Sequence, residues 1–224
     1  MFKRTYLRVA RFEAIVFDMD GVLLDSEPLH FEALTAVLAA DGLRLSITEF
    51  QTFIGTTTRA MFATLIDRYG LPRLSSEYIA LYDAEILRIL GQPHPPAPGA
   101  IDLLATARTC GLRVGLASSS RRVWIDATLR SIGLEGTFET IVSGDDVTHS
   151  KPDPEIYLAA AARLAIAPDR CLAIEDSPNG ATSAHRAGMQ VIGVRTPYTA
   201  HLRLDGVLYI VNSLTEVDLP QTLQ

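Results

Sequence analysis

The sequence predicts an α/β fold: a Rossmann-like, three-layer core built around a parallel sheet, with an all-helical cap domain inserted into it. Four consecutive apolar residues, Ala14 to Phe17, suit a strand that is covered on both faces, as in a parallel sheet. From residue 100 onward, strand-like and helix-like segments alternate, which is typical of parallel strands joined by helical crossovers. No strand is obvious between these two regions, and this helical stretch therefore predicts an insert.

The predicted insert carries apolar residues at helical spacing, which favours helix throughout residues 28–69 and again over residues 75–90. The apolar residues that recur in the first part include Leu29, Phe31, Leu34, Val37, Leu38, Phe62, Leu65 and Ile66. Residues 92–99 are dense in proline, which resists helix formation and acts as a stiff connector. We therefore expect a discontinuous core of residues 1–27 and 96–224 and a cap of residues 28–95.

The alternating part of the chain predicts the remaining elements of the core. The expected strands cover residues 112–117, 140–142, 171–174, 191–194 and 208–211. The expected helices cover residues 100–110, a segment through Trp124 and Leu129, residues 155–164, and a segment from Pro178 to near Gly188. Gly111 suits the C-cap of the first of these helices, and Trp124 is expected to pack in the core.

The bulk composition indicates a soluble protein and excludes several classes of partner. The 224 residues carry a net charge of −6 with no long basic run, so we expect no nucleic-acid partner. No apolar stretch approaches the roughly 20 residues that span a bilayer, and the start lacks the apolar core of a signal peptide. Cys110 and Cys171 form no metal-type pair and are expected to be small apolar residues in a reducing compartment. We expect a cytoplasmic monomer, since periodicity reveals no exposed apolar patch.

Polar side chains follow four strands of the predicted sheet at the point where each strand ends. They are Asp18, Asp20, Ser118, Lys151, Glu175 and Asp176. Asp18 and Asp20 lean to the same side because side chains in a strand alternate between faces. The carboxyl ends of parallel strands lie at one edge of the sheet, where open α/β sheets bind ligands. The sequence therefore predicts one site that holds four carboxylates, a hydroxyl and an ammonium.

These residue types suit a phosphate-and-metal site. Hard carboxylate oxygens favour Mg²⁺, and the lack of clustered His or Cys argues against zinc. One carboxylate can attack phosphorus, and a second, two residues on, can protonate the leaving oxygen and then activate water. The Ser118 hydroxyl and nearby backbone N–H groups can hold phosphate oxygens, while Lys151 supplies positive charge.

Each residue also has a simpler interpretation when taken alone. Asp-x-Asp-Gly occurs in calcium loops, although Leu29 stands where such a loop needs its Glu. Ser118 suits a helix cap, Lys151 a solvated loop charge, and Glu175 a favourable charge at a helix N-terminus. Four such coincidences on one edge of a sheet are less plausible than a shared site.

The motifs resemble those of the haloacid dehalogenase-like hydrolases over nearly the whole chain beyond Arg11. Residues 18–27 resemble the first motif of that family, Ala117-Ser118 the second, residues 151–154 the third, and residues 175–178 the fourth. The resemblance is greatest to the branch that contains β-phosphoglucomutase, phosphoglycolate phosphatase and sugar-phosphate phosphatases. That branch carries a helical cap after the first motif, which matches the predicted insert.

The resemblance implies a role for each motif residue. Asp18 would be the nucleophile and Asp20 the general acid/base, and the second Asp argues against dehalogenation. Mg²⁺ would be held by Asp18, the Asp20 backbone carbonyl and Asp176, with Glu175 a further ligand or a close partner of the ligands. Ser118, the Ser119 amide and Lys151 would bind the transferring phosphoryl group.

Residues around the cap are expected to select the substrate. Arg59 lies in a segment that resembles a cap loop offering an Arg to a distal anion, and His30 matches a His near the active site of β-phosphoglucomutase. Ser120 and Arg121 follow the second motif and are in position to contact the remote end of a substrate. A cap lysine used by β-phosphoglucomutase has no counterpart in residues 80–83.

The sequence thus predicts a Mg²⁺-dependent phosphatase that hydrolyses a small phosphorylated metabolite, such as a sugar or polyol phosphate, through an aspartyl phosphate. A phosphosugar mutase that uses the same chemistry is the alternative within the family. A non-enzymatic phospho-acceptor, like response-regulator receivers, is an alternative of another class. The predicted cap argues against it, because receivers have no lid that excludes water.

Overall fold

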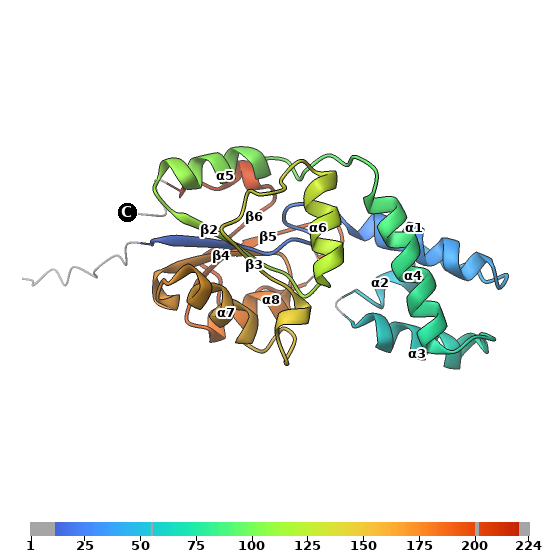
Figure 1. Cartoon of the computed structure of the whole chain (residues 1–224). Coiled ribbons are helices and arrows are strands. Elements are labelled where there is room, and N and C mark those ends of the chain that lie inside the picture. Colours follow the sequence, from blue (N-terminus) through green and yellow to red (C-terminus); the bar gives the residue numbers. More distant parts are fainter. Residues whose placement is uncertain (1–11, 55, 200–201, 220–224) are drawn as a thin grey trace, which may run out of the picture.

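A computed structural model describes residues 12–54, 56–199 and 202–219 and contains one six-stranded parallel sheet (Figure 1). The strands are β1 Ala14–Phe17, β2 Arg113–Ala117, β3 Thr140–Val142, β4 Cys171–Glu175, β5 Gln190–Val194 and β6 Tyr209–Val211. Their order across the sheet is β3-β2-β1-β4-β5-β6, with every neighbouring pair parallel. The predicted α/β class and all six predicted strands are confirmed.

The register of the central strands aligns their carboxyl ends. Phe17, the last residue of β1, lies opposite Leu116 of β2 on one side and Ile174 of β4 on the other. The residues that follow β1, β2 and β4 therefore emerge side by side at the middle of one sheet edge. This alignment places the end of β1 beside two segments that lie more than 90 residues further along the chain.

Helices cover both faces of the sheet and bury its side chains. Ile15 and Phe17 of β1 belong to an apolar cluster with α5 Ala100–Thr109 and α6 Arg122–Ser131. Ala14 and Val16 belong to a second cluster with α7 Glu155–Leu164 and α8 Pro178–Arg186. Because alternate residues of one strand enter different clusters, an unbroken apolar sequence is what this strand requires. Short 3₁₀ turns occur at Gly144–Asp146, Pro168–Arg170 and Leu214–Glu216.

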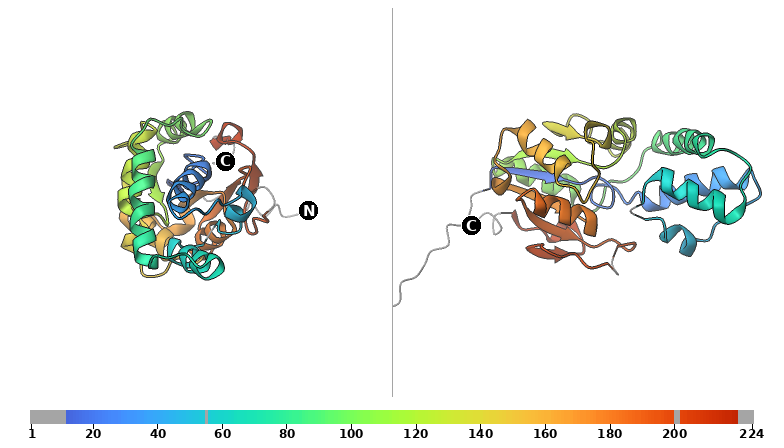
Figure 2. Two further views of the ribbon diagram at one scale, coloured as in Figure 1. Left: turned by 90° about the vertical axis from the view of Figure 1, so that its right-hand side faces the viewer. Right: turned by 90° about the horizontal axis from the view of Figure 1, so that it is seen from below.

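Four helices lie together beyond the carboxyl ends of the strands (Figures 1 and 2). These cap helices are α1 Glu27–Ala39, α2 Ile47–Gln51, α3 Thr58–Tyr69 and α4 Ser75–Leu90. Helix α4 packs against α1 and α3, and it also contacts α6 of the core. The division into a core of residues 1–27 and 96–224 and a cap of residues 28–95 stays a prediction.

The prediction of unbroken helix over residues 28–69 was wrong. The chain leaves the helical conformation between α1 and α2 and again between α2 and α3. Ser46 starts α2 with a capping box, in which its side chain accepts from the Glu49 N–H and the Glu49 carboxylate accepts from the Ser46 N–H. Thr57 caps α3 by accepting from the Ala60 N–H. Apolar spacing continued across these breaks and concealed them.

Two smaller expectations have different outcomes. Cys171 is buried in the sheet as predicted, whereas Cys110 is exposed at the end of α5, so the prediction that both pack as apolar residues was wrong for Cys110. Within the described ranges, no helix combines the length and the apolar character that a membrane span requires.

Candidate active site

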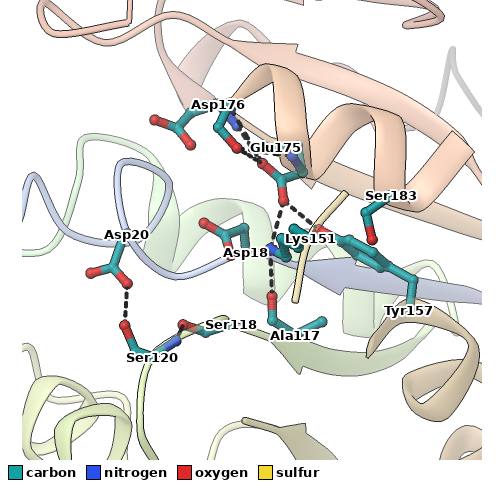
Figure 3. Close-up of polar contacts among 12 residues, drawn as sticks. Asp18, Asp20, Ala117, Ser118, Ser120, Lys151, Tyr157, Glu175, Asp176 and Ser183 are labelled. Atoms are coloured by element: carbon teal, nitrogen blue, oxygen red, sulfur yellow. Dashed lines mark hydrogen bonds and ion pairs between the residues drawn. The ribbon is translucent and has the colours of Figure 1, made fainter. Parts of the chain in front are cut away.

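Lys151 links two carboxylates at the centre of the sheet edge (Figure 3). Its Nζ donates to Asp18 Oδ1 at 2.6 Å, to Glu175 Oε1 at 2.7 Å and to the Ala117 carbonyl at 3.0 Å. The Lys151 side chain is only 7% exposed. Burial alone would lower the pKa of Lys151, but the two carboxylates outweigh it and hold this pKa above its ordinary value. The ammonium is therefore a permanent positive charge beside Asp18.

Glu175 is fully buried, and hydrogen bonds from the protein occupy both of its carboxylate oxygens. Besides Lys151, Oε1 accepts from Tyr157 Oη at 2.7 Å. Oε2 accepts from the Asp176 N–H and from the Ser177 hydroxyl, each at 3.1 Å. This arrangement positions Lys151 and leaves Glu175 behind the open part of the site.

Two residues that the sequence analysis missed complete the surroundings of Glu175. One is Tyr157 on α7, and the other is Gly180 on α8. A β-carbon at position 180 would overlap the Glu175 carboxylate, so only glycine allows the helix to pass so close. The available signal was a glycine inside a predicted helix, where it is unfavourable unless space requires it.

Three carboxylates form a compact cluster that fits a hard cation. Oxygen atoms of Asp18, Glu175 and Asp176 lie within 4.8 Å of one another, and all three residues are buried. Burial, helped by Glu175 and Asp20 and opposed by Lys151, raises the pKa of Asp18 to about 7. Burial and the charges of Glu175 and Asp18 also raise the pKa of Asp176. A bound divalent cation would relieve this repulsion, and the all-oxygen donor set suits Mg²⁺.

The turn after β1 brings the chain against this cluster. Gly21 has a φ of +75°, and a β-carbon there would overlap the Asp176 carboxylate. Glycine therefore supplies both the left-handed conformation and the close approach.

Asp20 lies apart from the buried network, on the wall of the cleft (Figure 3). Its Oδ2 accepts from the Ser120 hydroxyl at 2.8 Å. Ser118 is fully buried beneath this wall, and its Oγ accepts from the Ser120 N–H at 3.1 Å. Ser119, which lies between these two serines in the sequence, lines the cleft. Two carboxylates from one strand end thus occupy different environments, one beside a fixed ammonium and one beside a hydroxyl.

The site opens into a cleft of about 580 Å³ between the sheet edge and the cap helices. Of the residues predicted to contact substrate, His30, Ser120 and Arg121 line this cleft. Arg59 is exposed on α3 and is not among the described residues that line it. Arg121 instead forms an ion pair with Asp83 of α4, which joins the core to the cap helices. That these four predicted residues bind substrate stays a prediction.

An aromatic group lies at the cap end of the cleft. His30 Nδ1 and Tyr82 Oη share a hydrogen bond of 2.7 Å, and the His30 and Trp124 ring centroids lie 5.8 Å apart. Burial lowers the pKa of His30, although Asp20 opposes this shift, so the imidazole is neutral near pH 7. Trp124 is 8% exposed and packs in the core as predicted, but it also faces the cleft.

Residues 12–188, which include Lys151 and the carboxylates described above, match the family model of haloacid dehalogenase-like hydrolases. The chain belongs to this family. Among the similar proteins is one named "Putative phosphatase YhcW" of Bacillus subtilis, which is 35% identical over 92% of this chain and 94% of its own length. Hexitol phosphatase B of Escherichia coli is 33% identical over 82% of this chain and 84% of its own length. A phosphorylated carbohydrates phosphatase of Thermotoga maritima is 32% identical over 80% of this chain and 83% of its own length.

A solved structure shares the fold over most of the chain. The crystal structure of CbbY from Rhodobacter sphaeroides in complex with phosphate superposes with a TM-score of 0.84. It is 28% identical in sequence, and the match covers 92% of this chain and 96% of that chain. The haloacid dehalogenase-like hydrolase that the four sequence motifs indicate is thus confirmed at the level of sequence and fold.

Proposed function

We propose that this hydrolase is a Mg²⁺-dependent phosphatase that cleaves small phosphorylated metabolites, of the sugar or polyol phosphate class, through an aspartyl phosphate on Asp18. The observation that carries the proposal is the pair of carboxylates after β1, since Asp18 contacts the Lys151 ammonium while Asp20 lines the cleft. Hexitol phosphatase B and the Thermotoga phosphatase, both similar over most of this chain, support the substrate class.

The cluster of buried carboxylates supports a Mg²⁺ site in the proposed mechanism. The Asp18 and Asp176 carboxylates and the Asp20 backbone carbonyl would hold Mg²⁺, and Glu175 would support them, since its oxygens already accept hydrogen bonds. Bound there, the ion would neutralise charge on the phosphate and on the buried carboxylates.

The residues then perform two displacements at phosphorus. In the first, a carboxylate oxygen of Asp18 bonds to phosphorus, the ester P–O bond breaks, and Asp20 donates its proton to the leaving oxygen. In the second, Asp20 takes a proton from water, whose oxygen attacks phosphorus and releases Asp18. The Lys151 ammonium, the Ser118 hydroxyl and the Ser119 N–H stabilise charge on the phosphoryl oxygens.

Hydrolysis of p-nitrophenyl phosphate by the Mg²⁺-loaded protein tests this assignment. Asp18→Asn should lower kcat at least about a thousandfold and abolish any burst of nitrophenolate. Asp20→Asn should keep a burst of one equivalent, because nitrophenolate leaves without a proton, and then stall. Addition of EDTA should remove turnover, and excess Mg²⁺ should restore it. A full burst of nitrophenolate from Asp18→Asn would show that Asp18 is not the nucleophile.

A product analysis separates the phosphatase from the mutase. Residues 80–83 hold no lysine, and Tyr82 and Asp83 line the cleft instead. Incubation with a hexose 1-phosphate and a bisphosphate primer should therefore yield free phosphate rather than the isomeric hexose phosphate. Isomer as the main product would favour the mutase, and no turnover on a broad panel of phosphate esters would favour a phospho-acceptor.

A further inference from the structure

The cap end of the cleft has no available positive charge among the described residues. Within the described ranges, the cleft is lined by one lysine, Lys151, and one arginine, Arg121. Lys151 is engaged by Asp18 and Glu175, and Arg121 is paired with Asp83. A second phosphate or a carboxylate on the substrate would therefore find no free counter-charge at this end.

One carboxylate adds an electrostatic barrier to anions there. Glu27, the first residue of α1, lines the cleft, and its side chain makes no hydrogen bond or ion pair with any residue that the structure describes. Burial, helped by the charges of Asp20 and Asp25, raises the pKa of Glu27 to about 7. Its carboxyl group is thus available to both donate to and accept from a hydroxyl group near neutral pH.

Two further polar groups, from residues that line the same cleft, are buried and have no partner in the part of the chain that the structure describes. Among the described residues, neither Trp124 Nε1 nor Ser26 Oγ has a hydrogen-bond partner, and both residues are buried, Trp124 with 8% and Ser26 with 3% of its surface exposed. Both residues line the cleft. Because an unpaired buried donor is costly, a ligand group that pairs with it gains affinity.

An aromatic wall adjoins these polar groups. The Tyr82 and Trp124 centroids lie 5.9 Å apart, and His30 lies within 6.1 Å of Tyr82. Such a wall packs against C–H groups, while the polar groups beside it suit hydroxyls, which both donate and accept. A polyol or sugar offers this combination.

We propose that Glu27, Ser26 and Trp124 form a subsite for a neutral, polyhydroxylated leaving group, and that the cleft selects polyol or sugar monophosphates over substrates with a second anionic group. This inference rests on the proposed phosphatase function. It assigns substrate selection to residues outside the predicted set of His30, Arg59, Ser120 and Arg121.

A matched pair of substrates tests the selection. Sorbitol 6-phosphate and 6-phosphogluconate differ only at the carbon farthest from the phosphate, which is a neutral alcohol in one and a carboxylate in the other. With the Mg²⁺-loaded enzyme, kcat/KM should be at least about tenfold higher for sorbitol 6-phosphate. A hexose 1,6-bisphosphate should be disfavoured to a similar degree. Equal or reversed preferences would overturn the proposal.

Variants connect the selection to the named residues. Glu27→Gln should lower the ratio of kcat/KM for sorbitol 6-phosphate to kcat/KM for p-nitrophenyl phosphate, mainly because KM for sorbitol 6-phosphate rises. The same variant should raise kcat/KM for 6-phosphogluconate. Trp124→Phe should lower the same ratio about fivefold to tenfold, since it removes only the N–H and part of the ring. Glu32→Gln, an exposed glutamate on the same helix, serves as the control. The proposal fails if the two cleft variants alter the ratio no more than this control.

A binding measurement separates this proposal from the proposed function. Trp124 is the only tryptophan in the chain, so its fluorescence reports occupancy of the cleft. In Asp18→Asn, sorbitol 6-phosphate should change this fluorescence at lower concentration than 6-phosphogluconate does. If both ligands change the fluorescence at the same concentration, the subsite is overturned, whether or not the parent enzyme hydrolyses any ester. If sorbitol 6-phosphate binds preferentially but the parent enzyme hydrolyses no ester, only the phosphatase function is overturned.

Discussion

The Lys151 ammonium lies 2.6 Å from Asp18 Oδ1, and both side chains are less than one tenth exposed. Glu175 and Asp176 share this buried volume, so three carboxylates surround one fixed cation. When all three are ionised, two negative charges remain, which matches the charge of one divalent cation. The arrangement therefore depends on Lys151 for its stability, and under the proposed function a bound Mg²⁺ would balance the two remaining charges.

Removal of the Lys151 charge should destabilise the protein strongly. Lys151→Met leaves the Asp18 and Glu175 carboxylates buried without their partner, and we expect a loss of about 3–5 kcal/mol in the free energy of unfolding. Urea denaturation at pH 8 without metal measures it. Arg163→Met is the control, because its ion pair with Asp146 is 43% exposed on the Arg side and is worth at most about 1 kcal/mol. Equal losses would contradict the role assigned to burial.

The Tyr157 hydroxyl should contribute measurably to stability. Tyr157→Phe removes a buried donor to Glu175 and should cost about 1–3 kcal/mol, because the carboxylate keeps its charge and loses a hydrogen bond. Tyr69→Phe removes a similar bond to Glu49 in a part-exposed position and should cost less. Denaturation midpoints of the two variants give the comparison, and a larger effect at position 69 would refute it.

A helical Gly→Ala substitution should here have the opposite of its usual effect. In most helices this change is stabilising by up to about 1 kcal/mol. Gly180→Ala instead places a methyl group against the Glu175 carboxylate, and we expect a loss of about 2 kcal/mol or more together with reduced phosphatase activity. Thr182→Ala, on the same helix, should change stability little. Thermal unfolding followed by circular dichroism distinguishes these outcomes, and a stabilised Gly180→Ala protein would disprove the close approach.

Glu27 should make the metal-free protein less stable as the pH rises. Burial and the nearby Asp20 and Asp25 raise its pKa from 4.5 to about 7, so the folded state holds this proton more tightly than the unfolded state does. Its contribution is fully present below about pH 4.5 and is lost as the pH rises through 7. When the pH is raised from 5 to 8, the free energy of unfolding of Glu27→Gln should therefore increase relative to that of the parent by on the order of 2 kcal/mol. Chemical denaturation at these two pH values measures the difference, and a parallel pair of profiles would exclude a raised pKa.

Much of the fold and the site followed from local sequence patterns. Apolar runs and turn residues located all six strands, since a strand buried on both faces needs unbroken apolar sequence. The polar residues that end these strands could then be assigned to one site, because parallel strands share their carboxyl edge. Asp18, Asp20, Lys151 and Asp176 indeed line one cleft.

Tertiary packing alone decided how these residues are used. Capping by Ser46 and Thr57 interrupts helices whose apolar spacing is continuous, and Glu175 is enclosed by Tyr157 and Lys151 from distant segments. The pairing of Arg121 with Asp83 likewise depends on a contact between α6 and α4. Periodicity records which face of an element is buried, whereas the partner of a buried polar group is set by segments far away in the chain. The sequence by itself thus determined which residues meet at the sheet edge, and the folded cleft decided which of their charges remain free to meet a substrate.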